Sequence, residues 1–234
     1  MPRNNQYNKA KGVADIVFLI DATGSMECCI KGLKENLNAF FTVLTNASAN
    51  NGYAINDWRA KVVGFRDIEW NEAPWLENNS FVRDVDQLRS QLAHLKTGNG
   101  VDWPESLLDA LYFVIQMGET EQGSEDPEKW RKTKEAARVV VVFTDAEYKP
   151  VMRVKGAEGG TVEDVVNCIN GQKIKLFLFA PDEPCYEELS RANSVEFQPV
   201  SGSGLDEVTK DPAVFEKLLK QLAATISISQ SYEL

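Results

Sequence analysis

The sequence predicts an α/β sandwich, in which one largely parallel β-sheet lies between two layers of helices. Three segments are apolar throughout and rich in β-branched and aromatic residues, namely Val13–Ile20, Val139–Phe143 and Ile174–Phe179. Continuous apolar runs of this length are typical of strands that are covered on both faces, as in parallel sheets. Helical patterns lie between these segments, and this alternation of strands and helices favours helices on both faces of the sheet.

Weaker patterns complete the predicted order of elements. Two further strand candidates are Ala60–Phe65 and Val195–Val200. Apolar residues recur at helical spacing over Ile30–Leu44 and over Leu107–Ile115, which predicts two amphipathic helices. We expect Pro104 at the first position of the second helix, where its fixed φ and missing N–H are tolerated.

The chain is expected to close with a helix over residues 212–228. Asp211 precedes it and can accept hydrogen bonds from its first N–H groups. The spacing of the apolar residues predicts that four side chains of this helix face the sheet: Val214, Leu218, Leu222 and Ile226.

Length and composition favour one globular domain. The chain has 234 residues, of which 43% are hydrophobic and 26% charged, as in ordinary globular proteins. We expect an N-terminal extension over 1–11, one domain over 12–228 and a C-terminal tail over 229–234. None of the four cysteines forms a CxxC pair, which favours free thiols and a cytoplasmic location.

The net charge of the chain disfavours two classes of partner. It is −10 at pH 7, with a sequence pI of about 4.8. A protein this acidic repels nucleic-acid phosphates and anionic membrane surfaces on average. No apolar stretch approaches the roughly 20 residues that a bilayer-spanning helix needs. We therefore expect neither nucleic acid nor a membrane as a partner.

Acidic and hydroxyl side chains follow the predicted strands, at the edge of the sheet where α/β proteins bind ligands. The first strand leads into Asp21, Thr23 and Ser25, which place three side-chain oxygens at alternate positions around a glycine. Asp145 follows the second strong strand, and Asp102 lies in a glycine-rich loop in front of a helix. Carboxylates and hydroxyls without nitrogen or sulfur ligands suit Mg²⁺ or Mn²⁺, so the sequence predicts a site for one of these ions.

The acidic residues also have simpler interpretations. Asp21 and Asp102 could instead cap the helices that follow them. Asp67 lies next to Arg66, and for Asp67 an ion pair is preferred to a direct metal role. For Asp21, the adjacent hydroxyls and two further strand-end acids favour metal ligation over capping.

Four motifs occur in order along the chain: DATGSM at 21–26, FRD at 65–67, GNGVDWPE at 98–105 and FTDA at 143–146. Together they resemble the von Willebrand factor A (VWA) domain, over about residues 12–227. The first motif is similar to the family's DxSxS signature, with threonine for the first serine. The DxTGSM, FRD and GxGxDxPE motifs are similar to those of an intracellular, bacterial-type subgroup.

The resemblance implies a more specific fold than the apolar patterns alone. It implies a Rossmann-like three-layer sandwich with a doubly wound, mostly parallel sheet of six strands. One short antiparallel strand is then expected at an edge of the sheet, near Phe81–Val82.

The resemblance also implies a metal-ion-dependent adhesion site (MIDAS). Its ligands would be Asp21, Thr23 and Ser25 from the first loop and Asp145 from the third. Asp102 stands where the family usually has a threonine of the second loop, and Thr97 is the alternative ligand from that loop.

Two functions of different classes are compatible with such a site. The first is a metal-dependent protein–protein interaction module, in which a partner donates an acidic side chain to Mg²⁺ or Mn²⁺. The resemblance places such modules as scaffolds or adaptors in multi-protein systems of stress response or defence. The alternative is a Mg²⁺-dependent phosphoryl-transfer enzyme with Asp21 as the nucleophile. We favour the binding module, because the later acidic motif that such enzymes need does not follow Asp145.

Overall fold

A computed structural model describes residues 12–46, 54–69, 74–98, 104–200 and 211–229. Its strands are β1 (Val13–Asp21), β2 (Asp57–Phe65), β3 (Leu76–Asn78), β4 (Ala137–Phe143), β5 (Ile174–Pro181) and β6 (Val195–Val200). Its α-helices are α1 (Glu27–Thr45), α2 (Val85–His94), α3 (Leu107–Ile115), α4 (Val162–Gly171), α5 (Pro184–Leu189) and α7 (Pro212–Ser229). No helix within these ranges has the length and apolar character needed to cross a membrane.

The six strands form one sheet in the order β3-β2-β1-β4-β5-β6. All neighbouring strands are parallel except β2 and β3, which are antiparallel. The predicted doubly wound, mostly parallel sheet with one antiparallel edge strand is therefore confirmed. The strand order reverses between β1 and β4, and in open α/β sheets ligands bind beyond the carboxyl ends of the strands at such a switch point.

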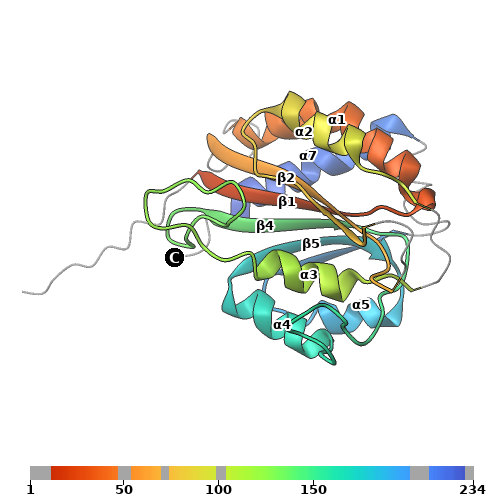
Figure 1. Ribbon diagram of the computed structural model, residues 1–234. Coiled ribbons are helices and arrows are strands. Elements are labelled where there is room, and N and C mark those ends of the chain that lie inside the picture. The colour runs from red at the N-terminus through yellow and green to blue at the C-terminus, as the bar shows by residue number, and fades with distance from the viewer. Residues whose placement is uncertain (1–11, 47–53, 70–73, 99–103, 201–210, 230–234) are drawn as a thin grey trace, which may run out of the picture.

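Helices cover both faces of the sheet, with α1, α2 and α7 on one face and α3, α4 and α5 on the other (Figure 1). The apolar run of β1 explains why both faces need cover. Ile16, Phe18 and Ile20 pack into the core beneath α1 and α7. Val17 and Leu19, which alternate with them, pack into the core beneath α3 and α4. A strand buried on both faces has no position for a polar side chain except near its ends.

The antiparallel edge strand lies a few residues before its expected place. It is β3, whereas Val82 makes only an isolated antiparallel bridge to Ala60. Asn79 lies between the two pairings, and its backbone N–H and its side-chain amide both donate to the carbonyl oxygen of Val62, at 3.3 and 3.0 Å. This double contact interrupts the ladder, so the residues at 81–82 do not continue the strand.

Helix α3 begins at Leu107, so the prediction that Pro104 occupies its first position is wrong. Glu105, the residue after Pro104, pairs instead with the segment that follows β4. Its N–H donates to the carbonyl oxygen of Glu147 at 2.9 Å, and its own carbonyl oxygen accepts from Lys149 N–H at 2.8 Å. This backbone pairing takes Glu105 out of the helix and ties two segments together at the switch-point edge.

The predicted C-terminal helix is confirmed as α7, but one of the four side chains predicted to face the sheet is exposed instead. Oδ1 of Asp211 accepts from the N–H of Ala213 at 3.0 Å, which is the predicted cap. Val214 is 49% exposed, contrary to the prediction, while Phe215 is fully buried together with Leu222 and Ile226. Phe215 packs so closely on α1 that a side chain at Gly32 would come within 2.9 Å of its ring, so the phenyl ring sets which face turns inward.

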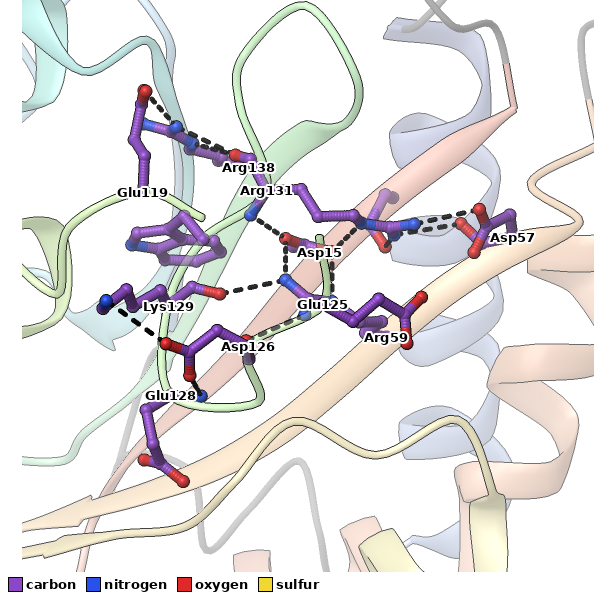
Figure 2. A network of polar contacts seen from close by, with 12 residues as sticks. Asp15, Asp57, Arg59, Glu119, Glu125, Asp126, Glu128, Lys129, Arg131 and Arg138 are labelled. Atoms are coloured by element: carbon purple, nitrogen blue, oxygen red, sulfur yellow. Dashed lines mark hydrogen bonds and ion pairs between the residues drawn. The ribbon is translucent and has the colours of Figure 1, made fainter. Parts of the chain in front are cut away.

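A buried ion network lies at the amino ends of the strands, opposite the switch-point edge (Figure 2). Asp15 on β1 is fully buried, and its carboxylate accepts two hydrogen bonds from the guanidinium of Arg59, at 3.0 and 2.6 Å. It also accepts from the N–H and from Nε of Arg131, both at 2.7 Å. Arg59 further donates to the carbonyl oxygens of Asp126 and Lys129, so the acidic segment 118–129 is fastened to the sheet at this end.

Candidate metal centre

The ends of β1 and β4 meet at the switch point through one side-chain hydrogen bond. β1 ends at Asp21, and Thr144 and Asp145 directly follow β4. The hydroxyl of Thr144 donates to Oδ2 of Asp21 at 2.9 Å, and Oδ1 of Asp21 accepts from the backbone N–H of Thr23 at 3.0 Å. Both carboxylate oxygens of Asp21 are therefore held in place by neighbouring loops.

Asp21 is fully buried, and its surroundings oppose its negative charge. Burial raises the pKa of its carboxyl to about 6, hydrogen bonds from Thr23 oppose the rise, and the charge of Asp145 adds to it. The effect of Asp145 on this pKa shows that the two acids share one electrostatic environment. A cation at this edge would favour the charged forms of both.

The hydroxyls of Thr23 and Ser25 lie beside this carboxylate on the same turn. Their oxygen atoms are 3.1 Å apart, and Ser25 is exposed while Thr23 is 6% exposed. Residues Gly24–Met26 form a 3-10 turn in front of α1, and Thr23 is the cap residue of that turn. Asp21 precedes the cap position, so the structure does not show the alternative in which Asp21 caps the first helix.

The second loop lies only partly within the described residues. Asp102 belongs to residues 99–103, outside the described ranges. Thr97, the alternative ligand, is exposed, and the next residue, Gly98, donates its N–H to the carbonyl oxygen of Ala22 at 3.0 Å. On the far side of the loop, Glu105 pairs with the segment after β4. Both flanks of the loop therefore contact the segments that follow β1 and β4.

Asp67 forms an ion pair, which is the interpretation that the sequence favours. Its partner is a lysine. Nζ of Lys149 lies 2.7 Å from one carboxylate oxygen of Asp67 and 2.6 Å from the other. Lys149 also bonds Glu69 at 2.8 Å, and the N–H of Glu69 donates to Asp67 at 2.9 Å. The sequence neighbour, Arg66, pairs with Glu77 instead.

Three residues at this edge were not among the predicted site residues. Thr144 orients Asp21, Lys149 neutralises Asp67, and Glu105 adds a buried carboxylate. Glu105 is 3% exposed, and burial raises its pKa to about 8, with further increases from the charges of Asp21, Asp67 and Asp145. Glu105 and Thr144 lie inside the GxGxDxPE and FTDA motifs, which is the signal that could have identified them.

The donor set at this edge fits a hard divalent cation. It consists of carboxylate and hydroxyl oxygens, which are the ligands of Mg²⁺ and Mn²⁺. Within the described ranges, no three His, Cys, Asp or Glu side chains are grouped so that they could hold a metal ion by themselves. The hydroxyls of Thr23 and Ser25, with Asp102 from outside these ranges, would therefore have to complete the coordination.

A comparison with protein-family models matches the chain over residues 15–201 to the von Willebrand factor type A domain. No curated protein matches it. The matched range runs from β1 through β6 and includes the loops after β1, β2 and β4 that bear Asp21, Asp67 and Asp145. The chain belongs to the von Willebrand factor type A domain family.

Proposed function

We propose that this protein is a metal-ion-dependent protein–protein interaction module of the MIDAS type. VWA domains commonly have this role. The ion would be Mg²⁺ or Mn²⁺, held by a set of ligands from three loops: Asp21, Thr23, Ser25, Asp102 and Asp145. Thr97 is the alternative second-loop ligand. Asp67 is not proposed as a direct ligand, because Lys149 already binds both of its carboxylate oxygens.

The observation that carries this proposal is the junction of Asp21 with Thr144 at the switch point. It keeps a fully buried carboxylate in one orientation, beside two hydroxyls whose oxygens are 3.1 Å apart. A buried carboxylate is unfavourable unless it is paired with a cation or fully hydrogen-bonded. Gly24 and Ser25, which follow Thr23 on the same turn, are exposed to solvent.

When bound, the ion would supply a positive centre with an open coordination position for a partner's carboxylate. The protein side chains would bind the ion and orient it, and no proton transfer or covalent step is needed. This role also agrees with the charge of the chain. At a net charge of −10, an acidic partner is repelled on average, so a local cation is needed to attract it.

We further propose that the module is cytoplasmic and acts as a scaffold or adaptor in a multi-protein system of stress response or defence. Two observations support the location: all four cysteines are free thiols, and they form no metal-binding pair motif. The similarity of the DxTGSM, FRD and GxGxDxPE motifs to intracellular VWA proteins supports the biological setting.

Affinity capture with the purified protein as bait tests the function. Proteins retained from a lysate of the source organism would be quantified with Mg²⁺ or with EDTA, for the native chain, Asp21→Ala and Asp86→Asn. Asp86 is an exposed carboxylate paired with Arg89 on α2, and it serves as the matched control. We expect a set of proteins that needs Mg²⁺, is lost with Asp21→Ala and is kept with Asp86→Asn. The same set in EDTA as in Mg²⁺ would contradict the proposal.

A phosphatase assay separates this function from the alternative enzyme. If the protein is a phosphoryl-transfer enzyme, it should hydrolyse a generic phosphoester in the presence of Mg²⁺, and Asp21→Asn should abolish this turnover. If it is a binding module, we expect no turnover. Phosphoryl-transfer enzymes of that type place a lysine beside the nucleophile, whereas Lys149 at this edge binds Asp67 and Glu69.

A further inference from the structure

Two buried tyrosines join helix α5 to the segment that follows β4. The hydroxyl of Tyr186 on α5 donates to the carbonyl oxygen of Ala146, and the hydroxyl of Tyr148 donates to the carbonyl oxygen of Cys185. The paired residues are 40 and 37 positions apart in sequence. Each segment therefore gives one phenol to the other, and we call this reciprocal pair of bonds the tyrosine clasp.

The ring of Tyr186 is held by two other aromatic rings. Its centroid lies 5.4 Å from that of Tyr148, in an edge-to-face arrangement, and 5.8 Å from that of Phe197, in a stacked one. A fully buried ring that is packed in this way is held in one orientation, so its hydroxyl is directed at a fixed point. A phenylalanine would fill nearly the same space, and packing alone therefore does not account for the hydroxyl.

The hydroxyl of Tyr186 lies among groups of the proposed metal centre. Burial raises the pKa of Tyr186 above its ordinary value, the charge of Asp21 adds to the rise, and a hydrogen bond with Thr144 opposes it. Thr144 is thus in contact with the phenol, and Asp21 is close enough to act on it. The hydroxyl of Thr144 in turn donates to Oδ2 of Asp21 at 2.9 Å. The phenol therefore contacts the side chain that orients the buried carboxylate.

The backbone is anchored on both sides of Asp145. Before it, the N–H of Thr144 donates to the carbonyl oxygen of Phe179 on β5 at 3.1 Å. After it, the N–H of Ala146 donates to the hydroxyl of Thr144 at 3.3 Å, and the carbonyl oxygen of Ala146 accepts from Tyr186. A distance of 3.3 Å is long for an N–H···O bond, so the phenol supplies the stronger of these two anchors of Ala146.

We propose that Tyr186 is a positioning residue of the metal centre. Its hydroxyl holds Thr144 and Ala146, and so fixes the backbone that bears Asp145 in the arrangement that binds the ion. This inference rests on the proposed metal-dependent function. Helix α5 bears none of the proposed ligands, and through Tyr186 it supports the loop that bears one of them.

Tyr186→Phe tests this role, because it removes the hydroxyl and keeps the ring. Tyr148→Phe is the matched control: it removes the other hydroxyl of the tyrosine clasp, which bonds to Cys185 and not to residues 144–146. The affinity for Mn²⁺ would be measured by calorimetry, at a temperature at which circular dichroism shows every variant to be folded. We expect Tyr186→Phe to lose about five- to tenfold, somewhat less than groups that bond a ligand directly, and Tyr148→Phe to lose less than about threefold.

Thermal unfolding in EDTA separates positioning from stability. Each variant loses one buried hydrogen bond between the same two segments, so the melting temperature should fall by a similar amount in both. A hydroxyl with a purely structural role predicts native Mn²⁺ affinity in both variants, or an equal loss in both. Either result would overturn the inference and leave the metal site standing. Native protein that binds no Mn²⁺ would remove both.

A second variant decides if Tyr186→Phe does not fold. In it, Tyr186 is replaced by 4-fluorophenylalanine, because fluorine fills the space of the hydroxyl but cannot donate a hydrogen bond. A loss of Mn²⁺ affinity of about threefold or more supports the inference, and a smaller change contradicts it.

Discussion

The hydroxyl of Thr144 donates a hydrogen bond of 2.9 Å to Oδ2 of Asp21, a residue 123 positions earlier in the sequence, and so links the end of β1 to the segment directly after β4. The strands themselves, β1 and β4, are neighbours in the sheet, and the strand order reverses between them. This contact fixes the carboxylate on which the proposed metal site depends.

Replacement of Thr144 by valine is expected to weaken both stability and metal binding. At pH 7.5 the Asp21 carboxyl, with a pKa of about 6, is mostly ionised, so the lost bond is one to a charged group. Such bonds contribute about 1.5–3 kcal/mol to the free energy of unfolding, which urea titration in EDTA would measure. Thr144→Ser keeps the hydroxyl and should lose less than half as much. Equal stability of Thr144→Val and the native chain would contradict the importance of this contact.

The buried ion network at the opposite edge predicts a large difference between two arginines. Arg131→Met removes an 8% exposed guanidinium that pairs with the fully buried Asp15 and with Asp57, and it leaves the Asp15 carboxylate short of a partner, which should cost about 3–5 kcal/mol. Arg83→Met removes ion pairs to Asp57 and Glu125 from a side chain that is 43% exposed, and should cost less than about 1 kcal/mol. Denaturant unfolding of both variants gives the comparison, and similar losses would show that burial does not decide the strength of these pairs.

Because Lys61 is buried, we expect the free energy of unfolding to depend on pH in the alkaline range. It is fully buried on β2, its Nζ donates to Asn78 at 2.8 Å, and burial lowers its pKa from 10.5 to about 8. Between pH 8 and 10.5 the unfolded lysine therefore holds a proton that the folded one has lost, so the free energy of unfolding rises with pH. The rise is at most about 3 kcal/mol.

The variant Lys61→Met isolates this effect from the other groups that titrate above pH 8. Urea unfolding would be measured at pH 7.5, 8.5 and 9.5 for both proteins. The native chain should gain stability relative to Lys61→Met over this range. A constant difference between the two would show that Lys61 keeps its ordinary pKa in the folded protein.

The central strands could be predicted from sequence because their environment is uniform. β1, β4 and β5 are buried on both faces, so nearly every position is apolar and the signal is strong. The edge strand β3 has three residues, of intermediate or high exposure, and Asn79 ends its pairing through contacts to Val62. Such a strand is set by tertiary hydrogen bonds, and no apolar pattern marks it.

Those residues of the candidate site that directly follow strands could be placed from the sequence. The ion pairs that join residues far apart in the sequence could not. Asp21 and Asp145 follow strong strands, so parallel topology alone brings them to one edge. Lys149 pairs with Asp67, which lies 82 residues earlier in the sequence, and Arg131 pairs with Asp15, which lies 116 residues earlier. In both cases a charged residue in a polar segment gives no sign of which buried acid it will meet, because the pairing follows from how the loops close over the sheet.

Calorimetric titration of Mg²⁺ and Mn²⁺ into the chelator-treated native chain, Asp21→Ala and Asp86→Asn measures directly whether Asp21 holds a metal ion. Asp21 lies at the junction of β1 and β4, whereas Asp86 is an exposed acid on α2. We predict saturable binding to the native chain and to Asp86→Asn, and none to Asp21→Ala at the same concentrations. Absence of binding to the native chain, or equal binding to Asp21→Ala, would contradict the proposed metal site.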